Sequence, residues 1–348
     1  MGAAESVLVT GVSGNLGSRL LPLLADYHVV GVDLRPPANS IEMRFTSLDL
    51  GEESSCHKLV ELLRETCATQ VVHLAFVLDP QGDGDSDVER MWQINVAGTA
   101  RVMEAITETN RLGGNIRKFI YPSSVAAYGS DTPGPVTETH PLNAHTLPYA
   151  IHKKEADEVV RYRADSLGDC SVYLLRPHIF TGAMMQNHFV GALQGTPTGK
   201  SARAERWRAA GKRLPLMLPF GKSYPEKKVQ FIHVDDMARL LAFLLHHEEP
   251  KQATHIFNVA AHGEPLTLQQ CVEIAKGKIM QVPGKWACRM TLRRLWNLGI
   301  TAVPPDALPY LIGSYTMDTS RLKKFLGEHY REIIQHDVAS ALSDSFRH

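Results

Sequence analysis

The chain has 348 residues, 44% of them hydrophobic, and 37 Lys and Arg balance 37 Asp and Glu. This length is enough for one large domain or two, and the zero net charge argues against a nucleic-acid-binding protein. The five cysteines lack Cys-x-x-Cys spacing, so we expect a cytoplasmic protein without a disulfide or metal framework. No apolar run reaches about 18 residues, and we therefore expect no membrane partner.

Strand-like and helix-like segments alternate through the first half of the chain. The strands are short and rich in Val, Ile and Leu, as in sheets that helices cover on both faces. The predicted strands are 6–10, 28–32, 70–74, 117–121 and 171–175. The predicted helices are 16–25, 55–66, 88–110 and 149–167. This alternation predicts an α/β fold with a Rossmann-type, doubly wound parallel sheet, which binds ligands at the carboxyl ends of its strands.

A glycine-rich loop follows the first strand and opens the first helix, in the order strand, loop, helix that dinucleotide sites require. Gly11 permits the tight turn, Gly14 lets the backbone approach a pyrophosphate, and Gly17 lets the helix pack closely on the sheet. The helix N-terminus offers N–H groups and a positive dipole to phosphates. We therefore assign Ser13, Asn15 and Leu16 to the same cofactor site.

Asp33 stands at the end of the second predicted strand. A carboxylate there accepts hydrogen bonds from ribose hydroxyls and repels a 2′-phosphate, which favours NAD as the cofactor. Arg35 lies two residues later and would attract that phosphate, so NADP stays an alternative. Asp49 and Leu50 are predicted to border the adenine of the cofactor. Alternatively, Asp49 is a helix-capping or turn aspartate.

Tyr149 and Lys153 are four residues apart on a predicted helix and therefore lie on the same face. An ammonium beside a phenol stabilises the phenolate and is expected to lower a pKa that is normally about 10. A phenol prepared in this way can pass a proton to or from a substrate oxygen near neutral pH.

With these motifs in place, the chain resembles the extended short-chain dehydrogenase/reductase superfamily, and within it the NAD-dependent epimerase/dehydratase family. The resemblance runs from about residue 6 to about residue 330. It rests on the glycine loop, the Tyr-Lys pair and further segments at 72–75, 95–99, 121–129, 175–177, 231–236 and 257–259.

The resemblance implies that Ser124 is the catalytic hydroxyl, with Ser123 as the competing candidate that faces the cofactor or backbone. A hydroxyl at the end of the 117–121 strand can also hydrogen-bond the substrate oxygen that Tyr149 protonates. Lys153 would in addition hold the nicotinamide ribose, and Asn95 would support a proton-relay water or brace its helix. The other implied cofactor contacts are Leu74, Ala75 and Pro177.

Two histidines inside these segments, His73 and His233, have apolar neighbours and are interpreted as packed structural residues.

Two positions differ from the pattern of relatives that act on nucleotide-sugars. Ile179 and Val229 stand where those relatives usually have an asparagine and an arginine that contact the diphosphate. Neither side chain can hydrogen-bond a diphosphate, which weakens the case for such a substrate.

The segment 198–228 carries nine basic residues against Glu205 and Glu226, a net charge of +7. It is interpreted as a solvated surface or as a lid that grips an anionic substrate, with a membrane-surface contact as the least favoured alternative. Residues 1–177 are predicted to form the NAD-binding domain, with its sheet completed by about 229–260. Residues 178–348 are predicted mainly to form the substrate-binding region and lid. The family resemblance implies a homodimer built from the helices near 88–110 and 149–167.

The sequence thus predicts an NAD-dependent oxidoreductase or epimerase that acts on a secondary alcohol or ketone of a sugar-like or cyclic small molecule. The alternatives are a nucleotide-sugar 4-epimerase proper and a steroid- or flavonoid-type ketoreductase. A non-catalytic NAD(P) sensor is disfavoured, because the chain keeps both Tyr149 and Lys153.

Overall fold

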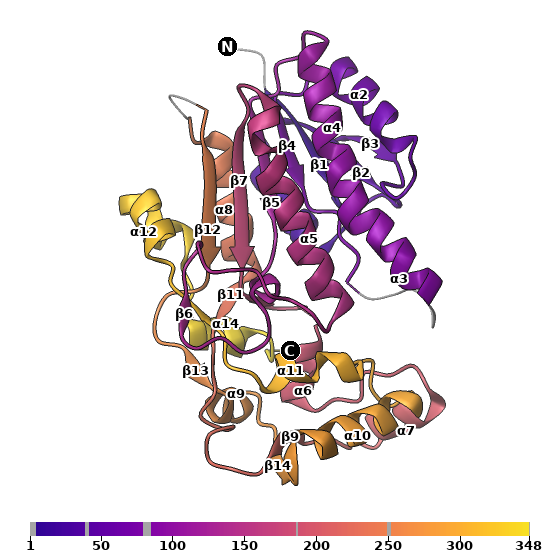
Figure 1. Cartoon of the computed structure of the whole chain (residues 1–348), viewed down its shortest axis with the longest axis vertical. Helices are drawn as coiled ribbons and strands as arrows, with labels where there is room; N and C mark the ends of the chain where they lie inside the picture. Colours follow the sequence, from indigo (N-terminus) through magenta and orange to yellow (C-terminus); the bar gives the residue numbers. More distant parts are fainter. Residues whose placement is uncertain (1–4, 39–41, 79–84, 186, 249–251, 348) are drawn as a thin grey trace.

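A seven-stranded parallel sheet dominates the computed structural model, which describes residues 5–38, 42–78, 85–185, 187–248 and 252–347 (Figure 1). The sheet order is β12-β7-β5-β4-β1-β2-β3, and every neighbouring pair is parallel. The strands are β1 (Ser6–Thr10), β2 (His28–Asp33), β3 (Arg44–Ser47), β4 (Gln70–His73), β5 (Lys118–Pro122), β7 (Ser171–Pro177) and β12 (Thr254–Val259).

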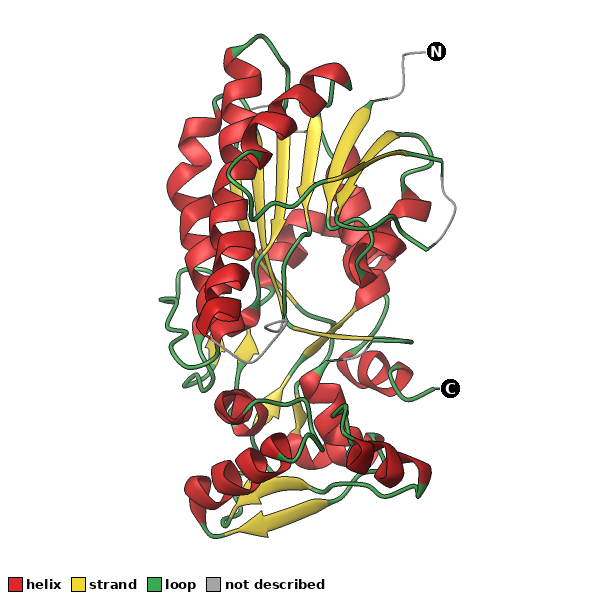
Figure 2. Cartoon of the chain, turned by 90° about the vertical axis from the view of Figure 1, so that its right-hand side faces the viewer, coloured by secondary structure: helices red, strands yellow, loops and turns green. Residues whose placement is uncertain are grey.

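Helices cover both faces of this sheet, which gives the three layers visible in Figure 2. One core joins the sheet to α2 (Ser55–Glu65), α4 (Gly98–Arg111) and α5 (Pro148–Arg163). The opposite core joins it to α1 (Asn15–Leu20) and α8 (Val234–His246). Because strands such as β1 are buried along their whole length, they need the continuous apolar runs seen in the sequence. The predicted Rossmann-type fold is confirmed.

The long helical segment before β5 is not one uniform helix. It consists of α3 (Asp85–Trp92), a π-helical stretch (Gln93–Ala97) and α4. The π-helical stretch brings Asn95 to the end of β4, where its side chain hydrogen-bonds the backbone of Val77. The predicted helix 149–167 likewise ends as a 3₁₀ turn (Ala164–Leu167) after α5.

A smaller part of the chain lies beyond the carboxyl ends of the strands, at the lower end of Figure 1. It contains short parallel pairs formed by β8 (Ile179–Thr181) with β11 (Phe231–His233), by β9 (Leu216–Pro219) with β14 (Ile279–Val282), and by β6 (Pro135–Val136) with β15 (Thr316–Met317). An antiparallel pair joins β10 (Lys228–Val229) to β13 (Leu266–Thr267). Within the segment 229–260, therefore, only β12 enters the central sheet.

Short helices complete this smaller part and enclose a third apolar core. The helices that contribute to this core are α6 (His188–Gln194), α9 (Leu268–Ile274), α10 (Gly284–Asn297), α11 (Leu308–Ile312) and α14 (Val338–Asp344). Helix α7 (Ala202–Ala209) lies in the same part of the chain. Two others, α12 (Ser320–Leu326) and α13 (Tyr330–Ile333), pack near β12 and α8. Throughout the described residues, every helix is too short or too polar to cross a bilayer.

Candidate active site at the carboxyl ends of the strands

The predicted site residues gather at one edge of the sheet, because parallel strands all end on the same side. The glycine loop follows β1, Leu74 and Ala75 follow β4, and Ser123 and Ser124 follow β5. Asp33 and Pro177 are the last residues of β2 and β7. The fold therefore brings together segments that are far apart in the sequence.

The glycine loop has the close packing that its sequence predicts. Gly11 has a φ of +68°, and a Cβ on it would lie 2.4 Å from the backbone nitrogen of Ala75. A Cβ on Gly17 would lie 2.5 Å from the carbonyl oxygen of Val12. Gly14 is the N-cap of α1, and among the described residues no side chain caps this helix, so its first N–H groups face the loop without a capping side chain. This arrangement fits a phosphate-bearing cofactor.

Asp33 is held in place by the loop that it faces. Its carboxylate accepts hydrogen bonds from the backbone N–H groups of Ser13, at 3.0 Å, and Leu34, at 2.7 Å. The Ser13 hydroxyl in turn donates to the carbonyl oxygen of Arg35, at 2.5 Å. The acidic residue is thus fixed beside the glycine loop, where a ribose would lie.

Asp49 has structural partners in this site. Its carboxylate accepts from the backbone N–H of Gly51, at 2.8 Å, and forms an ion pair with Arg90 of α3. These contacts support the interpretation of Asp49 as a turn aspartate, whereas its contact with an adenine stays a prediction. Leu50 is buried beneath the same turn.

Asn95 is fully buried and holds the loop that follows β4. Its amide accepts from the N–H of Val77 at 2.7 Å and donates to the Val77 carbonyl at 2.9 Å, with His152 Nδ1 at 3.5 Å. These bonds favour the bracing role over support of a proton-relay water.

Tyr149 and Ser124 come from different elements and meet at this edge. Ser124 caps the 3₁₀ turn Val125–Tyr128, and its hydroxyl accepts the N–H of Ala126 at 3.1 Å. Burial raises the pKa of the Tyr149 phenol, and its hydrogen bond with the Ser124 side chain opposes that shift. The net shift is upward, opposite in direction to the lowering expected from Lys153, because burial outweighs the hydrogen bond with Ser124.

Lys153 is buried one turn after Tyr149. Its ammonium donates to the carbonyl oxygen of Pro122 at 2.8 Å and lies 3.7 Å from the centre of the Phe76 ring. Burial lowers the pKa of Lys153 to about 7, although the Asp157 carboxylate opposes this shift. Phe76 also packs edge-on against Tyr149, with ring centres 5.7 Å apart. The sequence did not single out Phe76, because it lies in an apolar run after β4.

Ser123 faces the backbone in this structure. Its hydroxyl lies 3.5 Å from the carbonyl oxygen of Lys153, and its N–H donates to the Leu175 carbonyl at 2.6 Å. Ser124 is therefore the serine whose side chain is directed to Tyr149.

A buried ion pair positions the helix that carries Tyr149 and Lys153. Arg176 of β7 donates two hydrogen bonds, both of 2.8 Å, to Asp157 of α5, and both side chains are fully buried. Arg176 also donates to Tyr128 Oη, which donates to Asn258 of β12. Burial alone would lower the pKa of Arg176, but its bonds to Asp157 raise it. This network fixes α5 to the sheet.

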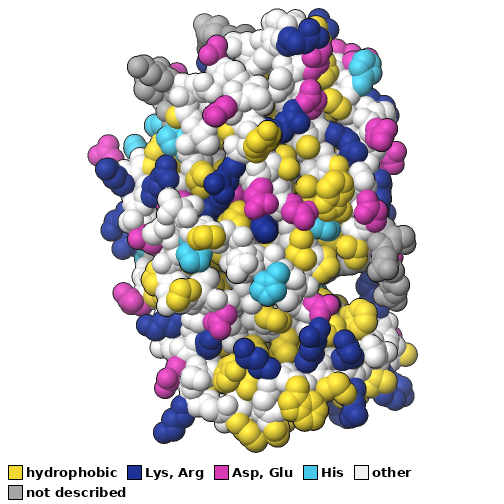
Figure 3. Space-filling model, in the orientation of Figure 1, with side chains coloured by type: hydrophobic (Ala, Val, Ile, Leu, Met, Phe, Trp, Pro, Cys, Tyr) yellow, Lys and Arg dark blue, Asp and Glu magenta, His cyan; other side chains and the backbone are white. Residues whose placement is uncertain are grey.

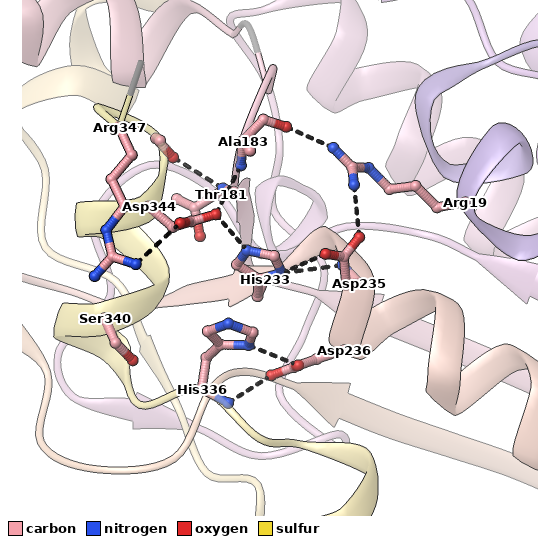
Figure 4. Close-up of polar contacts among 12 residues, drawn as sticks. Arg19, Thr181, Ala183, His233, Asp235, Asp236, His336, Ser340, Asp344 and Arg347 are labelled. Atoms are coloured by element: carbon pink, nitrogen blue, oxygen red, sulfur yellow. Dashed lines mark hydrogen bonds and ion pairs between the residues drawn. The ribbon is translucent and has the colours of Figure 1, made fainter.

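His73 and His233 are buried, as predicted. His73 lies between the hydroxyls of Thr10, at 2.6 Å, and Thr99, at 3.0 Å, and burial lowers its pKa to about 3. His233 belongs to a more polar cluster at the start of α8 (Figure 4). Its Nδ1 accepts the N–H of Asp235 at 3.1 Å, and its Nε2 lies 3.2 Å from Asp344 of α14.

The same cluster contains three potential metal ligands, His233, Asp236 and His336, whose ligand atoms lie within 4.8 Å of one another. The two imidazoles are stacked, however, with centres 3.8 Å apart and planes only 9° from parallel. A zinc–nitrogen bond of about 2 Å lies in the ring plane, so stacked rings cannot share one ion. Asp236 instead accepts hydrogen bonds from His336 and Arg239. We interpret the cluster as a set of structural contacts that hold α8 against the C-terminal segment.

Comparisons with known proteins now decide the family. A model described as the NAD dependent epimerase/dehydratase family matches residues 7–260, which is well over half of the chain. The chain belongs to this family.

Relatives of the family include UDP-glucose 4-epimerase 4 of Oryza sativa subsp. japonica, which is 30% identical over 256 residues. That match covers 68% of this chain and 66% of the rice enzyme, slightly less than two thirds of its length. UDP-glucose 4-epimerase of Homo sapiens is 25% identical over 311 residues, covering 82% of this chain and 86% of the human enzyme.

Solved structures of similar fold cover nearly the whole chain. WbmH of Bordetella bronchiseptica, in complex with NAD+, has a TM-score of 0.67 and 16% identity, covering 98% of this chain and 97% of its own. UDP-glucuronic acid 4-epimerase of Bacillus cereus, in complex with UDP-glucuronic acid and NAD, has a TM-score of 0.66 and 18% identity, covering 98% of each chain. At these identities the likeness shows the fold.

Within this family fold, Ile179 and Val229 are packing residues. Val229 is fully buried in β10, and Ile179 packs against the same apolar core from β8. The basic segment 198–228 forms α7 and β9 at the lower end of Figure 1, and its Lys227 pairs with Asp131 at 2.8 Å.

Proposed function

We propose that this chain catalyses NAD-dependent hydride transfer at a secondary alcohol or ketone of a sugar-like or cyclic substrate, with Tyr149 as the general acid and base. The observation that carries the proposal is the meeting of Ser124, from the end of β5, with Tyr149, from the first turn of α5. This pair lies at the same sheet edge as the glycine loop and Asp33. Family membership supports the same chemistry.

The proposed roles follow from the position of each group. NAD, when bound, accepts a hydride from the substrate carbon or returns one to it. Tyr149 takes up or supplies the matching proton at the substrate oxygen, and Ser124 hydrogen-bonds that oxygen. Lys153 lies along the same helix, where its charge favours the phenolate, and it would hold the nicotinamide ribose.

The residues present fit NAD. The loop around Gly14 leaves backbone N–H groups for the phosphates, and the fixed Asp33 carboxylate suits ribose hydroxyls. Arg35 is exposed, and its carbonyl oxygen is engaged by Ser13, so its side chain alone would have to attract a 2′-phosphate. The acidic residue therefore favours NAD over NADP.

A nucleotide-sugar 4-epimerase is the second candidate, because UDP-glucose 4-epimerases are among the relatives. The buried Val229 opposes it, since an apolar side chain in a core offers nothing to a diphosphate. Interconversion of UDP-glucose and UDP-galactose by the purified protein would establish this candidate. Activity on uncharged cyclic alcohols without UDP-sugar turnover would reject it. The homodimer through α4 and α5 and the cytoplasmic location stay predictions.

Substitution of Tyr149 tests the chemistry directly. In Tyr149→Phe we expect turnover to fall by about 10²- to 10⁴-fold, because the general acid is lost, and in Ser124→Ala by about 10²-fold. Titration calorimetry should show that both variants still bind NAD. Tyr162→Phe is the matched control, because Tyr162 lies on the same helix and is 89% exposed. Undiminished turnover in Tyr149→Phe would refute the proposal.

The cofactor content of the purified protein separates the two reaction types. An epimerase returns the hydride to the same substrate and would retain NAD tightly, whereas a dehydrogenase or reductase must exchange its cofactor in each cycle. Bound NAD without turnover on any UDP-sugar, free sugar or cyclic ketone would instead support a sensor.

A further inference from the structure

One end of the molecule exposes an unusual number of large apolar side chains. Among the described residues, twelve large hydrophobic side chains are exposed, and half of them lie on or beside β9, β14 and α10. These six are Phe220, Met280, Trp286, Met290, Trp296 and Leu298. Trp286 is the most exposed of the six, at 71%. If exposed apolar residues were distributed evenly along the chain, segments this short would contain far fewer than half of them.

The fold leaves a large part of each of these side chains uncovered. Helix α10 already buries an apolar face, with Cys288 and Leu292 in the core of the smaller part. Trp286, Met290 and Trp296 project from the exposed remainder of the same helix. A helix with a packed apolar face and further exposed aromatic residues has a surface available for another partner.

The same end carries a large excess of positive charge. We call residues 198–228 and 276–300 the basic end; they contain fifteen Lys and Arg and two acidic residues, Glu205 and Glu226. Fifteen minus two gives +13, so the rest of a chain with zero net charge carries −13. Figure 3 shows Lys, Arg and hydrophobic side chains together at the lower end, while Asp and Glu lie mainly above it.

Both segments of the basic end belong to one continuous surface. Strand β9 pairs with β14, and Phe220 after β9 donates a backbone hydrogen bond to Val282. Ser201, at the start of α7, hydrogen-bonds the Gly299 carbonyl just after α10, at 2.8 Å. In the described part of the chain, Arg293 and Arg294 of α10 form no ion pair or hydrogen bond through their side chains. Their charges are therefore available to an outside partner.

We propose that the basic end docks onto the surface of an anionic phospholipid bilayer. Exposed Trp together with Met and Leu suits the boundary between headgroups and acyl chains, and surrounding Lys and Arg are attracted to anionic headgroups. A second copy presenting the same face would bring two strongly basic surfaces together, which opposes a symmetric dimer here. Single-stranded nucleic acid would use the aromatic rings for stacking, but it gains little from Met280, Met290 and Leu298.

This contact is peripheral and differs from a membrane span. From the sequence alone we expected no membrane partner and ranked a membrane-surface contact of 198–228 last, because the sequence does not reveal that the apolar and basic residues share one exposed surface. The proposal stands independently of the proposed chemistry, since none of these residues is among the proposed catalytic or cofactor-binding residues.

Vesicle sedimentation tests the proposal with the whole protein. We expect binding to vesicles of phosphatidylcholine mixed with phosphatidylglycerol, no binding to phosphatidylcholine alone, and release at high salt. Arg293→Glu with Arg294→Glu should weaken binding by at least about tenfold. Binding should also shift the tryptophan fluorescence to the blue, and Trp286→Ala should reduce both the shift and the affinity.

The matched control reverses two charges far from the basic end. Lys58 and Arg64 are exposed on α2, at the opposite end in Figure 1, so Lys58→Glu with Arg64→Glu should bind vesicles like the unchanged protein. Circular dichroism should confirm that each variant is folded. No vesicle binding, equal binding to neutral vesicles, or an equal loss in the α2 control would overturn the proposal. Retention on single-stranded RNA without vesicle binding would also overturn it and indicate a nucleic-acid surface.

Discussion

In the proposed chemistry Lys153 must be charged to assist Tyr149, and yet its side chain lies buried. Within the described part of the chain, its ammonium donates to the Pro122 carbonyl oxygen and lies over the faces of Phe76 and Tyr121. The aromatic faces attract the cation, but burial has the larger effect and lowers the pKa to about 7. A group with this pKa changes charge in the range in which many enzymes work.

The Phe76 ring should therefore set the pH range of activity. In the free enzyme Lys153 is charged below pH about 7, so kcat/KM should fall as the pH rises through that value. Phe76→Ala admits water to the ammonium and should raise the pKa of Lys153. The descending limb of the kcat/KM profile should then move to higher pH by about one unit. This shift corresponds to a change of about 1.4 kcal/mol in the free energy of protonation of Lys153.

Phe76→Leu serves as the control for this prediction, because it keeps an apolar cover over the ammonium. In Phe76→Leu, the descending limb of the kcat/KM profile should lie at nearly the same pH as in the unchanged enzyme. A profile that is the same in Phe76→Ala would show that Phe76 does not determine the titration of Lys153. The pKa of Lys153 can also be measured directly by NMR with labelled lysine.

The sequence predicted those site residues whose identity follows from local geometry. Gly11 was predictable because its positive φ and its contact with Ala75 leave no room for a side chain. Phe76 was not, because an apolar residue after a buried strand has no feature that distinguishes a cover over Lys153 from ordinary core. The opposing effects on the Tyr149 pKa also depend on burial, which no spacing of residues reveals.

At the scale of the element, helix α5 carries three successive functions on one face. Tyr149, Lys153 and Asp157 are each four residues apart, so they lie above one another along the helix. Tyr149 meets Ser124, Lys153 meets the end of β5, and Asp157 meets Arg176 of β7. The ion pair at the third position thus fixes the orientation of the first two.

Removal of the charge at Asp157 should destabilise the protein strongly. Asp157→Asn leaves the buried Arg176 without its carboxylate, and we expect the free energy of unfolding to fall by about 3–5 kcal/mol in denaturant titrations. Asp157→Leu combined with Arg176→Met removes both charges and should recover part of that loss. Glu108→Gln, which breaks the exposed pair with Arg111, should have no measurable effect. A loss in Asp157→Asn no larger than in Glu108→Gln would contradict the positioning role.

Elements were predictable from sequence where burial on both faces imposes an apolar run. Strand β1 was predicted correctly for this reason, whereas β3 was missed. Arg44–Ser47 contains one apolar residue, and it forms the edge of the sheet, where only one neighbouring strand is needed. The Arg176–Asp157 pair could not be predicted either, because it depends on how β7 packs against α5.

At the scale of the whole molecule, several histidines are buried as neutral groups, which makes stability dependent on pH. Burial lowers the pKa of both His73 and His178 to about 3, from an ordinary value near 6.5. His178 donates through Nε2 to the Tyr315 carbonyl at 3.0 Å and accepts the Ile179 N–H at 2.9 Å. In these positions each ring serves as a neutral donor and acceptor.

The sign of the effect follows from proton uptake. Above pH about 6.5 both histidines are neutral in the folded and unfolded chains, and their contribution to stability is complete. As the pH falls below that value, the unfolded chain binds protons that the folded chain does not. The free energy of unfolding should then decrease by about 1.4 kcal/mol per pH unit for each histidine, down to the folded pKa near 3.

Urea titrations between pH 7 and 4.5 isolate this effect, because ordinary carboxylates titrate mainly below that range. His178→Gln should make the dependence shallower, even if it also lowers stability at pH 7. His246→Gln is the control with the opposite sign, since the bond to Asp26 raises the pKa of His246 despite some burial. The His246–Asp26 pair stabilises the fold below the pKa of His246 in the unfolded chain, and this contribution is lost as the pH rises through its pKa in the folded protein. Removal of the pair should therefore make the free energy of unfolding decrease more steeply as the pH falls. A free energy of unfolding that stays constant from pH 7 to 4.5 would show that the buried histidines accept protons in the folded state.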